Sequence, residues 1–194
     1  MKLWLVRHAQ PLVDAGICYG RLDVAADAGA TAECARKLAA QLPAGIRVVS
    51  SPLQRCEQLA HVLQALRPDW AYKTDGRLQE MDFGDWEGRA WQDIDRAELE
   101  AWTSDFAHYT VGREGDSVTA FMSRVGSAFD ALQGQGDTLW ITHAGVIRAV
   151  ALLAQGVRHI GHAGQWPLEA PNYGQWRLLN LHTGQAHRLP PDHA

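Results

Sequence analysis

Short apolar runs alternate along this chain with longer segments in which apolar residues recur every three or four positions. The first run, Leu3-Trp4-Leu5-Val6, is continuous, as is typical of a strand buried on both faces. Further strands are expected at 46–50, 70–73, 138–142 and 175–181. Helices are expected at 32–42, 53–66, 90–102, 117–133 and 146–155. This alternation predicts an α/β fold, a three-layer α/β/α sandwich with a mainly parallel central sheet.

Glycine, proline and serine mark where these elements begin and end. Ser51-Pro52 predicts the start of the second helix, with serine as N-cap and proline at the first helical position. Residues 9–28 are expected to form a long glycine-punctuated loop, and such loops usually carry function. The polar, acidic and aromatic segment 76–88 is expected to be irregular.

The overall composition limits the classes of partner. A chain of 194 residues fits a single domain, 1–194, and a formal net charge of -4 argues against nucleic acid as the main partner. No apolar stretch is long enough to span a membrane, and the amino terminus does not resemble a signal peptide. Cys18, Cys34 and Cys56 have neither CxxC nor zinc-like spacing, which predicts reduced thiols in a cytoplasmic protein. The sequence leaves open whether the chain forms a homodimer.

Two of the expected strands end in a histidine. His8 follows Arg7 at the end of the first strand, and His143 follows the strand 138–142. The carboxyl ends of parallel strands lie at one edge of the sheet, where open α/β folds place their ligands. Taken alone, Arg7-His8 is more often the solvated start of a loop than a catalytic centre. The second strand of the same design favours the interpretation that both imidazoles meet in one site.

Two further residues fit chemistry on an anion. Arg55 lies in the first turn of the second expected helix, where unpaired N–H groups attract anions, and its guanidinium can hold two phosphoryl oxygens at once. Glu80 lies between apolar neighbours in an acidic segment and is a candidate carboxyl for giving a proton to a leaving oxygen. Asp82 competes with Glu80 for that role.

Four motifs in a fixed order resemble those of the histidine phosphatase superfamily, whose fold is called phosphoglycerate mutase-like. Together they extend over most of the chain up to about Leu153. The four motifs are Leu5-Val6-Arg7-His8, Ser50-Ser51-Pro52-Leu53-Gln54-Arg55, Leu78-Gln79-Glu80-Met81-Asp82-Phe83-Gly84-Asp85-Trp86-Glu87-Gly88 and Thr142-His143-Ala144-Gly145-Val146-Ile147-Arg148.

The resemblance implies a mechanism. His8 would attack phosphorus and carry a phosphohistidine intermediate. Arg7, Arg55 and His143 would stabilise the charge of the transition state. Glu80 would protonate the leaving oxygen and then deprotonate the attacking water. The partner would be a small phosphorylated substrate, and no cofactor or metal is implied because arginines and histidines supply the positive field. The expected substrate-binding residues are Arg7, Gln10, Tyr19, Gly20, Arg55 and Ala144.

Two features bear on the substrate. The segment 16–24 is similar to a loop of α-ribazole-5'-phosphate phosphatases, and Tyr19 or Trp86 could stack on a flat base. The segment between Gly88 and Asp116 is shorter than in phosphoglycerate mutases, which favours hydrolysis over transfer. The leading substrate is therefore α-ribazole-5'-phosphate. A broad-specificity sugar-phosphate or phosphoglycerate phosphatase or mutase, and a phosphate-ester binding protein without turnover, are the alternatives.

The chain departs from the family pattern at three positions. Ala9 and Gln10 stand where the family has glycine followed by glutamate or threonine, and Asp116 stands where it often has glutamate. If the turn after His8 requires a positive φ, alanine would be strained there. Asp116 is one methylene shorter than glutamate and would reach less far toward His8. These departures motivate the binding-protein alternative.

Overall fold

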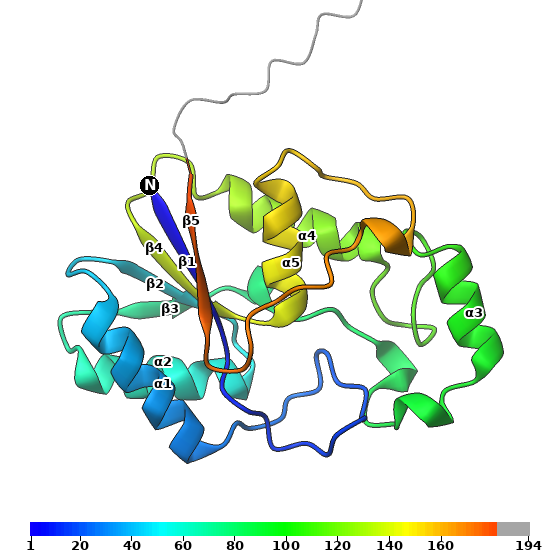
Figure 1. Cartoon of the computed structure of the whole chain (residues 1–194), viewed down its shortest axis with the longest axis horizontal. Helices are drawn as coiled ribbons and strands as arrows, with labels where there is room; N and C mark the ends of the chain where they lie inside the picture. The colour runs from blue at the N-terminus through cyan, green and yellow to red at the C-terminus, as the bar shows by residue number, and fades with distance from the viewer. Residues whose placement is uncertain (182–194) are drawn as a thin grey trace, which may run out of the picture.

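A five-stranded sheet forms the centre of the computed structural model, which describes residues 1–181 (Figure 1). The strand order is β3-β2-β4-β1-β5, with β1, β2, β3 and β4 parallel to their neighbours and β5 antiparallel to β1. The expectation of a mainly parallel sheet is therefore confirmed. Residues 182–194, which the expected single domain includes, lie outside this description. The strands are β1 (Lys2–Arg7), β2 (Arg47–Ser50), β3 (Tyr72–Thr74), β4 (Thr138–Thr142) and β5 (Trp176–Asn180).

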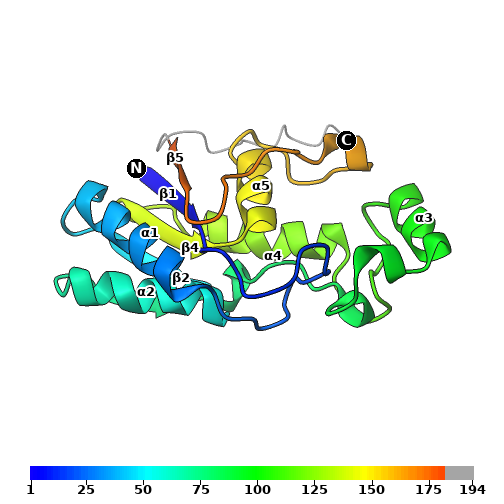
Figure 2. The ribbon, with the colours of Figure 1, turned by 60° about the horizontal axis from the view of Figure 1, so that its bottom comes forward.

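Helices cover both faces of the sheet, which confirms the three-layer architecture (Figures 1 and 2). The first two helices lie side by side on one face, and the fourth and fifth lie on the other. The third helix lies apart from the sheet, on the right in Figure 1. The helices are α1 (Ala28–Gln41), α2 (Gln54–Leu66), α3 (Arg96–Ser104), α4 (Val118–Asp130) and α5 (Ala144–Leu153). Within residues 1–181, no helix has the length and hydropathy needed to cross a membrane.

The continuous apolar strands follow from burial on both faces. Leu5 of β1 and Trp140 of β4 pack with α4 and α5, whereas Val6, Leu139 and Ile141 pack with α1 and α2. Every residue of β4 is buried, as befits the central strand. A strand with only one buried face would show alternating polar positions instead.

The helix expected over 90–102 is wrong in its first part. A 3₁₀ turn covers Trp91–Asp93, and α3 begins only at Arg96. Asp95 is the N-cap, and its carboxylate accepts the N–H of Ala97 at 2.8 Å. The side-chain cap provided by aspartate sets the start of the helix later than the apolar pattern indicates.

The second helix lies close to the expected range 53–66, but Ser51 is not its N-cap and Pro52 is not its first residue. Helix α2 begins at Gln54, and its N-cap residue, Leu53, offers no side-chain cap. The carboxylate of Asp23, in the long loop, accepts the N–H of Gln54 at 2.7 Å. The loop therefore performs the capping, and the Ser51 hydroxyl serves another purpose, described below.

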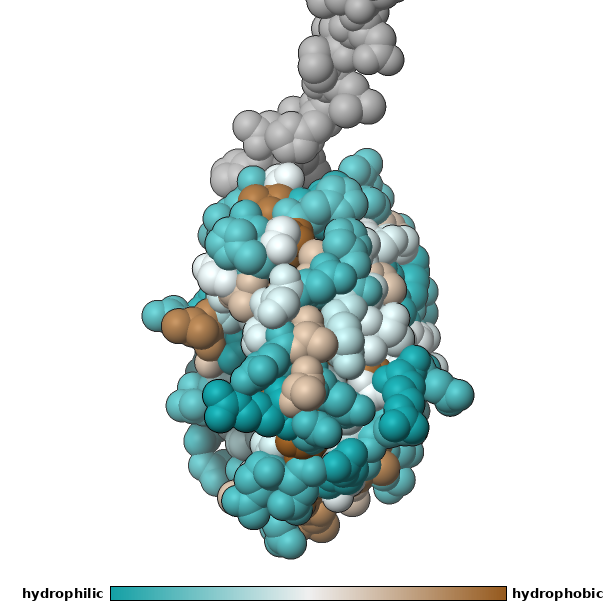
Figure 3. Space-filling view, turned by 90° about the vertical axis from the view of Figure 1, so that its right-hand side faces the viewer, coloured by the Kyte–Doolittle hydropathy of each residue, from teal (hydrophilic) through white to brown (hydrophobic). Residues whose placement is uncertain are grey.

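The face of the molecule that carries α3 is mainly hydrophilic, with apolar residues scattered over it (Figure 3). The aromatic residues of this region pack inward. Trp86 is fully buried, and its ring lies 5.7 Å from that of Trp102 and 6.4 Å from that of Trp91. Its indole Nε1 donates to Glu98 at 2.6 Å. The suggestion that Trp86 stacks on a substrate base is therefore wrong, because it is a core residue.

The backbone of the acidic segment 76–88 packs directly against the backbone around Gly112. The Asp85 N–H donates to Gly112 O at 2.9 Å. Gly112 has a φ of 53°, and a Cβ on it would overlap Phe83 O and lie 2.6 Å from Asp85 N. Glycine is required at Gly112 by both the left-handed backbone and the close approach.

We expect Gly112→Ala to lower the free energy of unfolding by about 3 kcal/mol, because alanine meets both a left-handed conformation and a backbone overlap. Gly134→Ala is the matched control, since Gly134 has a φ of 74° with nothing within 4 Å of its Cβ position. In this control variant the free energy of unfolding should fall by only about 1 kcal/mol. Urea unfolding of both variants measures the difference, and equal losses would contradict the close packing.

Candidate active site

His8 and His143 lie together at the carboxyl ends of β1 and β4. In the parallel register Arg7 pairs with Thr142, so the next residue of each strand is a histidine. The His8 N–H donates to Thr142 O at 3.0 Å, and the two ring centroids are 5.2 Å apart. His8 is 2% exposed and His143 is fully buried. The expectation that two strands bring their histidines to one point is confirmed.

The His8 ring is neutral and has one nitrogen available. Its Nδ1 lies 2.7 Å from Ala9 O. A carbonyl oxygen can only accept, so Nδ1 carries the proton and Nε2 holds a lone pair. Burial, followed by the positive charge of Arg55, lowers the pKa of His8 to about 3; the bond to Ala9 opposes this shift and Arg7 adds to it.

His143 is held in the opposite tautomer. Its Nδ1 accepts from Arg55 Nε at 3.3 Å, so Nε2 carries the proton and donates to Ser51 Oγ at 2.8 Å. Burial, and then the charge of Arg55, place the pKa of His143 well below its ordinary value. Ser51 thus orients an imidazole, and its hydroxyl also accepts the N–H of Leu53 at 3.4 Å.

Arg55 is a fully buried cation near the start of α2. Besides its bond to His143, its guanidinium donates to Leu22 O at 2.8 Å and to Gly20 O. Among the residues that the structure describes, no carboxylate lies within ion-pair distance of it. Burying a charge without a counter-charge is costly, so this position favours an incoming anion.

Arg7 is a second cation of this kind. Its guanidinium carbon lies 3.8 Å from the centroid of the Tyr173 ring, and NH1 donates to Pro171 O at 3.2 Å. Its buried Nε has no hydrogen-bond partner, and no carboxylate within residues 1–181 pairs with it. Arg7 and Arg55 therefore flank the two imidazoles with positive charge that the described part of the chain leaves unneutralised.

Two tyrosines border the histidine pair. The Tyr19 hydroxyl lies 2.6 Å from that of Tyr173, whose ring centroid is 5.5 Å from that of His8. The family resemblance predicted Tyr19 near the site, whereas nothing in the sequence indicated Tyr173. No periodicity marks the segment around Tyr173, which reaches the site because it precedes β5, the neighbour of β1.

Glu80 and Asp82 have different surroundings. Glu80 Oε2 accepts the N–H of Gly145 at 2.9 Å, in the first turn of α5 and two residues after His143. A Cβ on Gly145 would overlap this carboxylate, so glycine permits the approach. Asp82 instead pairs with Arg21 at 3.2 Å. Of the two candidates, Glu80 is the one whose carboxylate contacts the first turn of α5, the helix that follows His143.

The remaining expected binding residues, Gly20, Ala144 and Gln10, differ in their contacts and in their exposure. Gly20 contributes a carbonyl to Arg55, and a Cβ on it would overlap Met81 O. Ala144 is buried as the first residue of α5. Gln10 is exposed and lines, with Tyr173 among others, a cavity of about 530 Å³ between α1 and the segment before β5.

The departures from the family pattern cause no strain in the fold. Arg113 is the one non-glycine residue with a positive φ in the described part of the chain, so Ala9 fits its turn. Asp116 bonds to Arg124 at 2.9 Å and accepts the N–H of Asp82 at 3.2 Å. Its role therefore lies with the segment that carries Glu80.

The three cysteines are buried and unpaired with one another. Burial raises the pKa of each thiol to about 12. Cys56 Sγ lies 3.6 Å from His143 Nε2 and packs against that ring. A thiol with so high a pKa is a poor nucleophile, so the chemistry of the site falls to the imidazoles.

Residues 3–186 match the family model of the histidine phosphatase superfamily, branch 1. The chain belongs to this superfamily. An adenosylcobalamin/alpha-ribazole phosphatase from Salmonella typhimurium is 29% identical over 96% of this chain and 93% of its own length. A phosphoglycerate mutase from Thermus thermophilus is 30% identical over 93% of each chain, with a TM-score of 0.67.

A mycobacterial glucosyl-3-phosphoglycerate phosphatase shares the fold, with a TM-score of 0.65 at 24% identity over 79% of this chain and 78% of its own. The four motifs thus correctly indicated a histidine phosphatase with a phosphoglycerate mutase-like fold.

The neutral state of His8 makes folding stability depend on pH. An unfolded histidine has a pKa of about 6.5, and folded His8 has one of about 3, so below the upper value only the unfolded chain takes up this proton. Stability is then lost as the pH falls. Between pH 7 and about pH 5.5, we expect the free energy of unfolding to fall by about 1 kcal/mol less in His8→Gln than in the wild type. Urea unfolding at both pH values measures this, and identical pH dependence of the two proteins would contradict it.

Proposed function

We propose that this histidine phosphatase is a metal-independent phosphomonoesterase that hydrolyses a small phosphate ester through a phosphohistidine on His8. One observation carries the proposal. Two neutral imidazoles lie 5.2 Å apart between Arg7 and Arg55, neither of which has a carboxylate partner in the described chain. A phosphoryl group supplies the missing negative charge and the electrophile at once.

In the first step, the lone pair of His8 Nε2 forms a bond to phosphorus while the ester P–O bond breaks. Glu80 gives its proton to the leaving alcohol oxygen. Arg7, Arg55 and His143 stabilise the charge on the transferring phosphoryl oxygens. For Arg55 this requires exchanging the carbonyls of the loop, Gly20 O among them, for phosphoryl oxygens. For His143 it requires exchanging Ser51 Oγ for a phosphoryl oxygen.

In the second step, water attacks the phosphorus of phosphohistidine. The Glu80 carboxylate takes a proton from that water, the N–P bond breaks, and its electrons return to His8 Nε2. Inorganic phosphate leaves, and both residues recover their starting states. The bond from His8 Nδ1 to Ala9 O supports this cycle because it keeps Nε2 aimed at phosphorus throughout.

For the substrate we propose α-ribazole-5'-phosphate, which would give α-ribazole and phosphate. Support comes from the similarity to the Salmonella phosphatase, which extends over nearly the whole of both chains. The loop 16–24 supplies the second argument, since its residue Tyr19 lies at the site. A tyrosine at the site offers an aromatic face for the base of α-ribazole.

A phosphoglycerate phosphatase or mutase is the second candidate. The specific observation in its favour is the similarity to the Thermus phosphoglycerate mutase, which extends over 93% of each chain at 30% identity. The two candidates differ in the acceptor of the phosphoryl group. A phosphatase passes it to water, and a mutase returns it to a second hydroxyl.

Two experiments test the proposal: a comparison of kcat/KM across a panel of phosphomonoesters, and rapid quenching of the enzyme during turnover to trap phosphohistidine. We expect α-ribazole-5'-phosphate to exceed 3-phosphoglycerate and sugar phosphates in kcat/KM by at least about tenfold, a difference of about 1.4 kcal/mol in transition-state binding. Radiolabelled substrate should leave acid-labile, base-stable label on the wild type and none on a folded His8→Ala variant.

Other outcomes would contradict parts of this assignment. Equal turnover of all esters would remove α-ribazole-5'-phosphate as the preferred substrate. Return of the label to an added phosphoglycerate would indicate a mutase. Binding without release of phosphate would replace the enzyme with a phosphate-ester binding protein.

Substitution of Glu80 tests the proton donor. We expect Glu80→Gln to lower kcat about a hundredfold for an alkyl phosphate, whose leaving oxygen needs a proton, and less than about tenfold for 4-nitrophenyl phosphate. Asp82→Asn is the matched control and should keep the alkyl-to-aryl ratio of the wild type. A changed ratio in Asp82→Asn with an unchanged one in Glu80→Gln would transfer the role to Asp82.

A further inference from the structure

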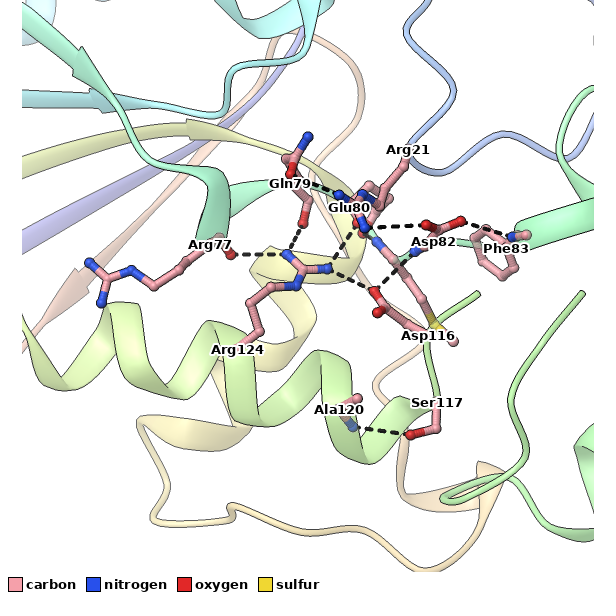
Figure 4. A network of polar contacts seen from close by, with 12 residues as sticks. Arg21, Arg77, Gln79, Glu80, Asp82, Phe83, Asp116, Ser117, Ala120 and Arg124 are labelled. Carbon is pink, nitrogen blue, oxygen red and sulfur yellow. Dashed lines mark hydrogen bonds and ion pairs between the residues drawn. The ribbon is translucent and has the colours of Figure 1, made fainter. Parts of the chain in front are cut away.

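Arg124 makes a cluster of polar contacts that the proposed mechanism does not use (Figure 4). It projects from α4, whose N-cap is Ser117, toward the segment that carries Glu80. Its NH1 donates to Arg77 O at 3.1 Å and to Gln79 O at 2.8 Å. Its NH2 donates to Glu80 O at 3.1 Å. One side chain thus binds three main-chain carbonyls within four residues.

Asp116 completes the cluster from the other side. Its Oδ2 accepts from Arg124 NH2 at 2.9 Å and from the main-chain N–H of Asp82 at 3.2 Å. Its own N–H donates to Asp82 O at 2.8 Å. Arg124 therefore holds the backbone from residue 77 to residue 80, and Asp116 holds it at residue 82. Glu80 lies within the stretch that these two side chains fix in place.

This arrangement fixes the direction of the Glu80 side chain. The Glu80 carbonyl points to Arg124, while its carboxylate accepts the N–H of Gly145 on α5. The preceding residues are tied to the sheet as well, because Thr142 Oγ1 donates to Leu78 O at 2.8 Å. An arginine suits this role, because its planar guanidinium carries several donors in fixed directions.

The pairing of Arg124 also separates it from the phosphate-binding arginines. Asp116 neutralises its charge within the fold, whereas Arg7 and Arg55 have no such partner in the described residues. Its guanidinium donates to main-chain carbonyls and Asp116, and its Cζ lies 5.1 Å from the centroid of the Phe121 ring. Its charge and its donors are therefore already satisfied within the fold, and it is not expected to bind substrate.

We propose that Arg124, with Asp116 as its counter-charge, is the positioning residue for the proton donor Glu80. This inference rests on the proposed function, because it assigns Glu80 the transfer of a proton to the leaving oxygen. The aspartate at position 116, where the family often has glutamate, then serves this support of the Glu80 segment.

The test compares Arg124→Met, which keeps an unbranched apolar stem and removes the guanidinium, with the wild type and with Glu80→Gln. We expect Arg124→Met to lower kcat for an alkyl phosphate at least about tenfold and for 4-nitrophenyl phosphate about two- to threefold, since proton donation matters less there. KM should stay within about twofold, because Arg124 makes no contact that substrate replaces.

A double-variant cycle separates positioning from a general loss of structure. In the Glu80→Gln background, Arg124→Met should cost less than about twofold for the alkyl phosphate, because the group it positions is gone. Arg124→Lys should recover part of the rate, since one ammonium reaches fewer of the carbonyls. Arg158→Met is the matched control: Arg158 pairs with Asp130 at the other end of α4, and its loss should leave kcat unchanged.

If Arg124→Met does not fold, Arg124→Met/Asp116→Asn, which removes the partner charge as well, takes its place in the cycle. Fully multiplicative effects of the Arg124 and Glu80 substitutions, or equal slowing of alkyl and aryl esters, would overturn this inference and leave the proposed function intact. A wild type that never forms phosphohistidine would instead overturn the proposed function.

Discussion

The contact between Arg55 and His143 is the interaction on which the rest of the site depends. It joins the first turn of α2 to the end of β4 through the bond from Arg55 Nε to His143 Nδ1. It fixes the tautomer of His143, and the same charge helps to lower the pKa of both imidazoles. A cation buried this deeply needs compensation, which loop carbonyls now supply in part and an anion would supply better.

Three arginines near the site differ in their binding partners. Arg124 pairs with Asp116 and directs its donors to main-chain carbonyls, so its charge supports the fold. Arg7 and Arg55 lie beside histidines, with no carboxylate partner among residues 1–181. The same residue type thus stabilises the fold where a carboxylate neutralises it and favours an incoming anion where none does.

The sequence predicted the centre of the site because that centre follows from the sheet. His8 and His143 each end an apolar strand, and a parallel register brings such ends together. Arg55 was found through its place in the first turn of a helix. These residues follow from local patterns, and the four ordered motifs assigned the chain to its family.

The parts that the sequence did not predict depend on contacts between distant segments. Tyr173 reaches His8 through the pairing of β5 with β1, and no local pattern reveals that pairing. Ser51 resembles a helix cap in the sequence, but its hydroxyl accepts a hydrogen bond from the buried ring of His143. Trp86 resembles a ligand-stacking residue because of its polar neighbours, yet its ring lies in the core. In each case tertiary packing outweighs the local signal.

Burial, reinforced by the positive charge of Arg55, lowers the pKa of both imidazoles and keeps them neutral, which leaves a lone pair on His8 Nε2. Nitrogen-15 NMR of the two histidine rings in the ligand-free protein at pH 7 measures this most directly. We expect two neutral rings, His8 protonated at Nδ1 and His143 protonated at Nε2. An imidazolium signal from either residue, or a His8 proton on Nε2, would contradict this claim.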